Sequence, residues 1–344
     1  MAEMLTVPVA ELRSRIFQAL REAGADESSA TATTKALVQA ALLGIDSHGA
    51  RLVPHYVRMM KAGRINPKPQ RKVLKRAAAS ALLDGDDGLG HATTFEAVTL
   101  AGELAKASGV GAVGVVRSSH FGATASYTMA GAEAGFITLV TCNTDMAVAL
   151  HGGAKWFHGT NPIGVAAPVA GKKPWMLEVA TSNMAFNKVA VYKAQGKPIP
   201  PDVGADENGE PTTDPDKFRM LLPLGGAAFG HKGAAFAGLA TVLSAVLTGA
   251  TLDPELISMW FAPDNSIPRN LGHFVLAIDP DHFVGRAAYD AAMSHYLTAL
   301  RAVPPRKGFK ILAPGDYEWE VEAQRMKDGL PIDAATAEFL GIKA

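Results

Sequence analysis

The first third of the chain has the apolar spacing of amphipathic helices. Apolar residues recur about every 3.6 positions in residues 9–23, before a glycine that provides a stop. A second helix, capped by Ser28 or Ser29, is predicted to end near Gly44, and a third to end at Gly63.

Buried strands alternate with helices in the next stretch. Short apolar runs predict strands at residues 80–84, 110–116 and 137–141, whereas residues 93–108 and 123–134 have a helical period. Each of the last two strands follows a helix that ends at a glycine.

The rest of the chain is predicted to be strand-rich first and helical again at its end. Residues 151–223 are rich in glycine, proline and short strands, with a hairpin turn at 206–209. A buried core helix is predicted at 233–247 and a strand at 273–278, followed by further helices. The pattern predicts an α/β fold in which a helical part, built from both ends of the chain, surrounds a β-rich centre.

Charge and cysteine usage narrow the class of protein. The chain has 33 basic and 33 acidic residues, so neither nucleic acid nor an anionic membrane is expected as its main partner. Cys142 is the only cysteine, which excludes an intrachain disulfide or a cysteine-based zinc site. The apolar stretch at 233–247 is shorter than the roughly 20 residues of a membrane span, and the N-terminus has no signal core. A soluble, cytoplasmic protein is expected.

Two sequence motifs imitate binding sites. Residues 109–114 match G-x-G-x-x-G, but there a helix precedes the glycines and a strand runs through them, the reverse of a dinucleotide-binding turn. Residues 206–217 resemble a calcium loop, yet Lys217 stands where a bidentate glutamate is required. The ten histidines show no metal-binding arrangement, so no metal is expected.

Two histidine segments remain as candidates for chemistry. They are Asp46-Ser47-His48-Gly49 and Ser118-Ser119-His120-Phe121-Gly122. Histidine titrates near neutral pH and therefore suits proton transfer, although a lone histidine in a turn is more often structural.

These segments, with five others, resemble the malate/L-lactate dehydrogenase-like family of NAD(P)-dependent oxidoreductases, a group unrelated to the Rossmann-type lactate dehydrogenases. The seven occur in family order and are residues 44–49, 117–122, 157–162, 178–182, 231–233, 269–272 and 313–316.

The resemblance implies a non-Rossmann fold in which a mostly antiparallel sheet holds the dinucleotide. It implies a helical, substrate-binding domain at residues 1–122, completed by 270–344, and a cofactor-binding domain at 123–269. It also implies a homodimer with its active site near the subunit contact.

Hydride transfer from a hydroxy acid needs a base close to the hydroxyl group. By resemblance His48 is the first candidate, with Ser47 orienting it, and His120 is the second, on the nicotinamide side. Thr160 matches the family's substrate-contacting threonine. Arg51 stands one residue before the position where some members carry a carboxylate-binding arginine, so its role stays open.

The resemblance also assigns cofactor contacts, among which Lys232 is the expected pyrophosphate partner because a lysine at a helix start would oppose the helix dipole. The contacts are His120, Phe121, Gly122, Ala123, Thr124, Thr144, Glu178, Val179, Ala180, Thr181, Ser182, His231, Lys232, Asn270, Ala313, Pro314, Gly315 and Asp316. The cofactor is expected to be NAD, with NADP left open.

The predicted reaction is hydride transfer between nicotinamide and C2 of a small 2-hydroxy or 2-oxo acid of the malate or lactate type. Ureidoglycolate oxidation is the first alternative, followed by reduction of a ketimine (pyrroline- or piperideine-2-carboxylate) or of diketogulonate. Lys188 stands where the ketimine reductases carry an aspartate, which weakens that alternative. A cofactor-binding protein without turnover is the non-enzyme alternative.

Overall fold

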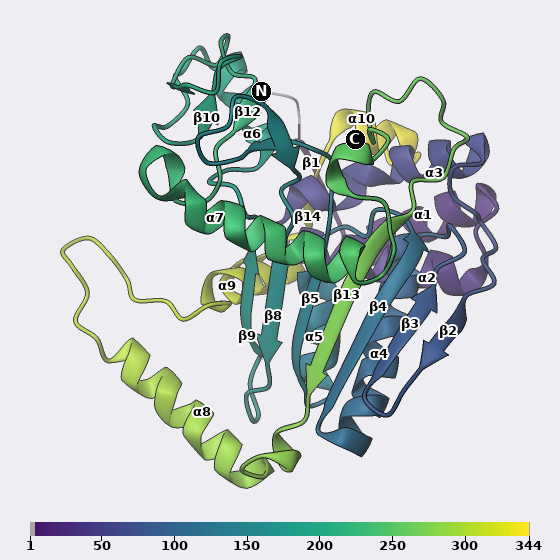
Figure 1. Ribbon diagram of the computed structural model, residues 1–344, viewed down its shortest axis with the longest axis vertical. Coiled ribbons are helices and arrows are strands. Elements are labelled where there is room, and N and C mark those ends of the chain that lie inside the picture. Colours follow the sequence, from purple (N-terminus) through teal and green to yellow (C-terminus); the bar gives the residue numbers. More distant parts are fainter. Residues whose placement is uncertain (1–3, 344) are drawn as a thin grey trace.

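A seven-stranded sheet forms the centre of the computed structural model, which describes residues 4–343 apart from the side chain of Asn187 (Figure 1). In spatial order its strands are β2 (Lys72–Arg76), β3 (Ser80–Asp84), β4 (Val110–Ser118), β13 (Leu271–Ile278), β5 (Ile137–Cys142), β8 (Ile163–Ala167) and β9 (Trp175–Val179). All neighbours are antiparallel except β3 and β4, which run parallel. The mixed α/β class predicted from the sequence is confirmed.

Helices cover both faces of this sheet (Figure 1). On one face lie α4 (Gly90–Ser108) and α5 (Ala125–Glu133), and on the other lies α7 (Gly226–Thr241) with its π-helical continuation η3 (Val242–Val246). Glycine allows α4 to approach the sheet closely, because a Cβ on Gly111 would lie 2.0 Å from the Ala101 carbonyl oxygen. Of the three glycines in residues 109–114, Gly109 caps the end of α4, and Gly111 and Gly114 lie in the packed strand β4. No helix begins at them.

A helical layer lies above one end of the sheet and joins distant parts of the chain (Figure 1). It contains α1 (Val9–Glu22), α2 (Glu27–Leu42), α3 (Val53–Ala62) and α10 (Ala334–Phe339), with β1 (Met4–Val7) paired to β14 (Leu330–Asp333). Their apolar faces form one buried core around Leu12, Ile16 and Tyr56. The predicted cap of α2 was wrong, because Asp26 is the cap and accepts from the Ser29 amide at 2.7 Å.

A smaller sheet and one helix lie beside α7. The sheet contains β11 (Pro211–Thr212), β10 (Gly204–Ala205), β12 (Met220–Leu221), β6 (Val148–Ala149) and β7 (Trp156–His158), and the helix is α6 (Phe186–Ala194). β10 and β11 form an antiparallel hairpin around residues 206–209, which confirms the predicted turn.

The core helix predicted at 233–247 begins earlier than expected. α7 starts at Gly226, directly after Gly225, and both glycines have positive φ angles of 62° and 99°. These two glycines form the turn into the helix, in a stretch between residues 223 and 233 for which the sequence pattern predicted no element.

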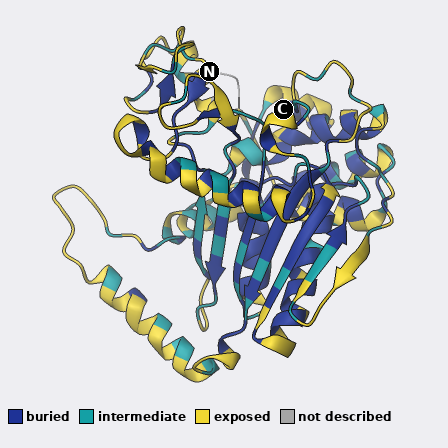
Figure 2. Ribbon diagram, in the orientation of Figure 1, coloured by how far each residue is buried: buried dark blue, intermediate teal, exposed yellow. Residues whose placement is uncertain are grey.

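The segment after β13 extends away from the body. α8 (Arg286–Arg301) buries only Leu297, and residues 302–310 of the loop that leads to α9 (Asp316–Asp328) are exposed (Figures 1 and 2). Tyr296, Val303 and Phe309 are about half exposed or more. Within residues 4–343, no helix combines the length and apolarity needed to cross a membrane.

The predicted domain boundaries fall beside β4 and β13. These two strands pair with each other in the central sheet, so strands from residues 1–122, 123–269 and 270–344 share one sheet. The assignment of separate substrate and cofactor domains stays a prediction.

Candidate active site

Predicted site residues gather at one edge of the central sheet because of its strand order. His120 and Thr144 each follow the C-terminal end of a strand, β4 and β5, by two residues. β13 runs antiparallel between these strands, and its first residue, Leu271, pairs with Ser118. Asn270, immediately before β13, therefore lies at the same edge.

Two further segments reach this edge from β8 and β9. Ile163 begins β8 and pairs with Thr141 on one side and Val179 on the other. Thr160, just before β8, and Thr181, just after β9, are therefore placed beside the end of β5. The topology brings together residues that are up to 150 positions apart in the chain.

His48 reaches His120 from the helical layer. It ends the short helix η1 (Asp46–His48), which Arg325 of α9 holds by donating to both carboxylate oxygens of Asp46. The Ser47 hydroxyl lies 2.8 Å from Nδ1 of His48. The imidazole rings of His48 and His120 stack with their centres 5.8 Å apart, so the two predicted histidines are adjacent.

Tyr56 on α3 fixes the second imidazole. Its hydroxyl lies 2.7 Å from Nδ1 of His120, and the Tyr56 side chain is fully buried. In both His48 and His120 the Nδ1 atom is thus engaged by a hydroxyl group. When Nδ1 carries the hydrogen and donates to that oxygen, Nε2 is the nitrogen that accepts a proton.

Burial keeps both imidazoles neutral at pH 7. Burial, together with the smaller effect of the positive charge of Arg51, lowers the pKa of His48 to about 4. Burial also lowers the pKa of His120 well below its usual value, and the charges of His48 and other neighbours act in the same direction. Neutral rings are the form that a general base requires.

Two buried histidines beside this pair were missed by the sequence analysis. His91 on α4 packs edge-on against Tyr56 at 4.9 Å, and neither of its ring nitrogens has a hydrogen-bond partner among the described residues. His273 on β13 is bonded at both nitrogens, to the Thr94 hydroxyl at 2.9 Å and to the Ser119 carbonyl at 3.1 Å. Both histidines lie within the first three residues of a buried element, α4 or β13. The surrounding apolar pattern predicts only that such residues belong to the core, so nothing in the sequence indicates that they lie beside His48 and His120.

Burial strongly affects these two rings as well. It lowers the pKa of His91 to about 3 and that of His273 to about 4. His273 also stacks on the buried Phe121 at 4.6 Å, so this predicted cofactor residue packs in the core beside the candidate pair. The next residue, Gly122, has a positive φ of 77° and turns the chain towards α5.

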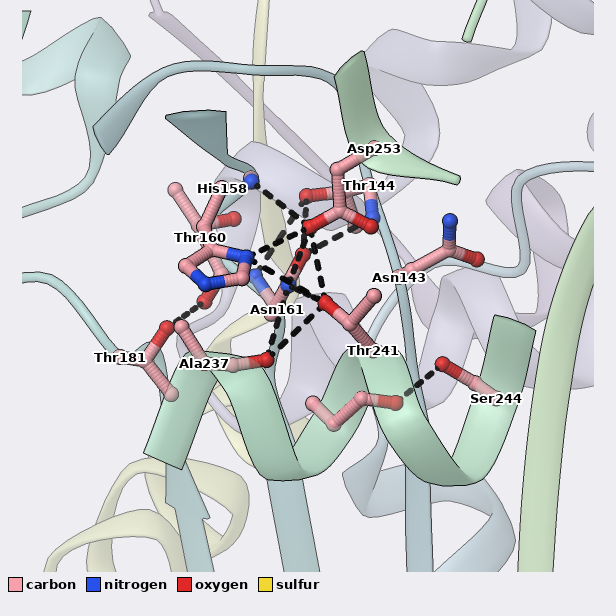
Figure 3. A network of polar contacts seen from close by, with 12 residues as sticks. Asn143, Thr144, His158, Thr160, Asn161, Thr181, Ala237, Thr241, Ser244 and Asp253 are labelled. Atoms are coloured by element: carbon pink, nitrogen blue, oxygen red, sulfur yellow. Dashed lines mark hydrogen bonds and ion pairs between the residues drawn. The ribbon is translucent and has the colours of Figure 1, made fainter. Parts of the chain in front are cut away.

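A tight turn between β7 and β8 joins three predicted threonines (Figure 3). The Thr181 amide donates to the Thr160 carbonyl at 2.8 Å, and the Thr144 amide donates to Oδ1 of Asn161 at 2.9 Å. A Cβ on Gly159 would lie 2.0 Å from the Thr144 hydroxyl, so the turn is in direct contact with Thr144.

A buried carboxylate beneath this turn was not predicted. Asp253, in the short helix η4 (Asp253–Glu255), accepts from His158 at 3.1 Å and from Asn161 at 2.7 Å (Figure 3). Burial alone would raise the pKa of Asp253, but these hydrogen bonds outweigh it and keep the pKa below its usual value. Asp253 is 92 residues from Asn161, and no local pattern indicates the contact.

Glu178 lies in a predicted cofactor segment but contacts a helix end. Its two carboxylate oxygens accept from the Thr124 and Ala125 amides, both at 2.9 Å, at the start of α5. Burial raises the pKa of Glu178 to about 7, although these hydrogen bonds oppose the increase. A carboxylate in this position satisfies free amides and the helix dipole. Its role in cofactor binding stays a prediction.

The predicted cationic residues are exposed. Arg51, in η2 (Ala50–Leu52), lies near enough to His48 to affect its pKa. Lys232 lies in the second turn of α7, with Nζ 5.3 Å from the centre of the Phe229 ring, so the expected conflict with the dipole of a helix start is absent. Its neighbour His231 lies against His151, with ring centres 5.5 Å apart.

The last predicted segment and Asn270 make structural contacts within the chain. The Pro314 carbonyl accepts from the Met176 amide at 3.2 Å, which places residues 313–316 beside the middle of β9. Asp316 begins α9 and pairs with Arg301 at 2.6 Å. Oδ1 of Asn270 accepts from the Arg117 amide at 2.9 Å.

A groove lies elsewhere on the molecule. It has a volume of about 860 Å³, runs between α2, α4 and α5, and is lined by Phe95, Val98 and Phe136 among others. None of the predicted site residues lines it. None of the seven sequence segments that resemble the family contributes a residue to it, so the histidine edge is the stronger candidate.

Comparison with known proteins identifies the family of this chain. The sequence model of the family described as "Malate/L-lactate dehydrogenase" matches residues 7–341. A malate dehydrogenase of Pyrococcus abyssi is 33% identical, over 95% of this chain and 90% of that enzyme. The NAD(+) ureidoglycolate dehydrogenase of Escherichia coli K12 is 32% identical, over 93% and 90%.

A solved structure has the same fold. The sulfolactate dehydrogenase of Methanocaldococcus jannaschii superposes with a TM-score of 0.91 at 31% identity, covering 98% of this chain and 95% of that one. The family model spans nearly the whole chain, and relatives above 30% identity cover more than nine-tenths of it. The chain belongs to the malate/L-lactate dehydrogenase family of oxidoreductases.

Proposed function

We propose that this protein is an NAD(P)-dependent dehydrogenase that transfers a hydride between nicotinamide and C2 of a small 2-hydroxy or 2-oxo acid. The relatives are named as dehydrogenases of malate, sulfolactate and ureidoglycolate, all of them hydroxy acids. The observation that carries the proposal is the stacked pair of neutral imidazoles, His48 and His120, at the sheet edge that also holds the predicted threonines.

His48 is the proposed acid/base group. In the oxidation direction its Nε2 accepts the hydroxyl proton of the substrate, while Ser47 holds Nδ1 and fixes the ring. His120, fixed in turn by Tyr56, faces the nicotinamide side and orients the reacting carbon. The nicotinamide cofactor, when bound, supplies the hydride acceptor. The low pKa of His48 favours the neutral base and therefore oxidation at neutral and alkaline pH.

The proposed binding groups include threonine hydroxyls and two exposed cations, Arg51 and Lys232. Thr160 contacts the substrate, and Arg51 pairs with its carboxylate. The threonine hydroxyls and backbone amides at this edge of the central sheet fit a dinucleotide, because such groups in glycine-rich turns bind phosphate oxygens well. Lys232 then binds the pyrophosphate through an exposed ammonium group.

The proposal also includes how the cofactor binds to the fold and how two chains assemble. The largely antiparallel central sheet supports a non-Rossmann mode of cofactor binding. The homodimer is supported by the extended α8 segment and its exposed apolar side chains. The cytoplasmic location stays a prediction.

The substrate alternatives keep their order. Ureidoglycolate remains the first alternative because a relative with that activity is as similar as the malate enzymes. Lys188, on α6, is exposed and offers no carboxylate to a ketimine nitrogen. Diketogulonate and the non-enzyme alternative have no observation in their favour.

A panel assay tests the proposal. Purified protein is mixed with NAD or NADP and with malate, lactate, sulfolactate or ureidoglycolate, and nicotinamide absorbance is followed. We expect reduction of one cofactor with at least one of the acids. If none reacts while the cofactor still raises the melting temperature, the protein binds the cofactor without turnover.

A further inference from the structure

We infer that Asp253 is a positioning residue that anchors the turn of residues 158–162 and thereby sets Thr160 and Thr144 in the active site. The inference rests on the proposed function for the role of the threonines. It rests on the structure alone for the anchoring contacts, which join η4 to a turn more than 90 residues away in the sequence.

A single carboxylate oxygen collects the donors of this turn (Figure 3). Oδ2 of Asp253 lies 2.7 Å from Nδ2 of Asn161, 3.1 Å from Nδ1 of His158 and 3.3 Å from the Gly159 amide. The Thr241 hydroxyl on α7 lies 3.0 Å from the same oxygen. Asp253 therefore contacts three residues of the turn, His158, Gly159 and Asn161, and links them to α7.

The other carboxylate oxygen, Oδ1 of Asp253, has no partner among the described residues, and the side chain is fully buried. Burying a carboxylate is unfavourable unless donors compensate for the lost water. Here all the compensation comes from donors on Oδ2. Hydrogen bonds to an ionised acceptor are about twice as strong as neutral ones, which suits an anchor.

Asn161 connects Asp253 to Thr144. Its φ angle of 31° lies in the left-handed region that non-glycine residues rarely adopt, so the conformation needs outside support. Its Nδ2 donates to Asp253, while its Oδ1 accepts from the Thr144 amide at 2.9 Å. One amide group thus links the buried carboxylate to Thr144.

Thr160 is held between two anchored neighbours. Gly159 and Asn161 both contact Asp253, and the Thr160 carbonyl accepts from both the amide and the hydroxyl of Thr181, at 2.8 and 2.9 Å. The backbone of Thr160 is therefore fixed, and its side chain is presented in one direction. Releasing Asp253 frees the turn without touching His48 or His120.

Two substitutions at this position separate anchoring from mere stability. Asp253→Ala removes the acceptor, whereas Asp253→Asn keeps an oxygen at the Oδ2 place and puts its amide group at the unpartnered Oδ1 place. For folded Asp253→Ala we expect kcat/KM for the hydroxy acid to fall about 10²-fold, mainly through KM, because misplaced binding groups have effects of that size. For Asp253→Asn we expect a loss of about tenfold or less.

Asp26→Ala is the matched control. Asp26 caps α2 by accepting from the Ser29 amide, far from the site in the helical layer. Its loss lowers the melting temperature but leaves kcat/KM per folded enzyme unchanged. A purely structural role for Asp253 predicts the same behaviour, and that result would overturn the inference.

Amide hydrogen exchange of the peptide spanning residues 156–163 provides a second measurement that needs no turnover. We expect exchange at least about tenfold faster in Asp253→Ala, with the segment around His120 unchanged. Unchanged exchange in 156–163 would also overturn the inference. If the wild-type protein turned over no hydroxy acid, the proposed function would fail, and the exchange rates alone would decide whether Asp253 anchors the turn.

Discussion

The histidine half and the threonine half of the candidate site are held in opposite ways. His48 and His120 each have one ring nitrogen engaged by a hydroxyl, and the surrounding packing is largely aromatic. The turn of residues 158–162 is instead held by many hydrogen bonds that converge on one buried carboxylate.

This difference matches what each half is proposed to do. A group that gains and loses a proton needs a free nitrogen and a pKa that is set by its surroundings. A ring with only one fixed hydrogen bond keeps its second nitrogen free for the proton. A group that only positions a ligand benefits from a rigid support, and a dense polar network provides one. In this fold the number of hydrogen bonds around a group therefore distinguishes the proposed proton-transfer residues, which have few, from the proposed positioning residues, which have many.

The largest effect is expected from the histidine half. His48→Ala should lower turnover by on the order of 10²–10⁴-fold while the cofactor still binds, because the proton acceptor is lost. Steady-state kinetics with saturating cofactor measure this. Unchanged turnover would remove His48 from the acid/base role and make His120 the candidate.

Gly159→Ala should disturb the threonine half without changing its charge. The added Cβ would lie 2.0 Å from the Thr144 hydroxyl and 2.5 Å from the Thr144 carbonyl, so the turn must shift. We expect kcat/KM to fall about 10²-fold. Gly238→Ala on α7 is the control, because its Cβ would meet only Nε2 of His158 at 3.9 Å, and a helical glycine-to-alanine change is usually favourable. Equal kinetics for both variants would show that the close contact is unimportant.

Acid should destabilise the histidine half first. The folded-state pKa is about 3 for His91 and about 4 for His273, whereas an unfolded histidine titrates near 6.5. Below pH 6.5 the unfolded chain therefore binds more protons than the folded chain. As the pH is lowered further, the free energy of unfolding falls by about 1.4 kcal/mol per pH unit for each of the two rings. Denaturant unfolding between pH 7.5 and 5.5 measures the slope. A flat profile would contradict neutral buried rings, and His91→Leu should make the slope shallower.

The smallest effect is expected at Lys232, an exposed cation on α7. Lys232→Ala should weaken cofactor binding by several-fold, the size expected when one exposed charge contact of about 1 kcal/mol is lost. Turnover at saturating cofactor should stay unchanged. Titration of protein fluorescence with the reduced cofactor measures the affinity. A normal affinity with reduced turnover would place Lys232 in another role.

Local patterns predicted the elements of this fold well. The apolar period of residues 9–23 became α1, and the helix-then-strand context of residues 109–114 correctly excluded a dinucleotide turn. The strand β2 was not predicted, and the helix α6 lies in a segment predicted to be strand-rich. Other errors lie at helix starts. Asp26 replaced the two serines as a cap, and the glycines at 225 and 226 started α7 seven residues before the predicted Gly233.

The candidate site was predictable only where residues lie in turns. His48 and His120 stood out because small residues flank them, and the structure stacks them. The hydroxyl contact of Tyr56 with His120 depends on the meeting of α3 with the end of β4. Asp253 depends on a contact across 92 residues. Such long-range partners are determined by topology, and no periodicity in a single sequence encodes them.

The position of β13 has a consequence for how the molecule is made. This strand lies in the middle of the sheet, between β4 and β5, yet it is formed by residues 271–278. A growing polypeptide has already produced β4 and β5 long before their shared neighbour leaves the ribosome. Until then both strands expose unpaired backbone edges, which are prone to aggregate. The central sheet can therefore be completed only late in synthesis, when β13 inserts between β4 and β5. The same step completes the edge of the sheet that holds His120 and Thr144.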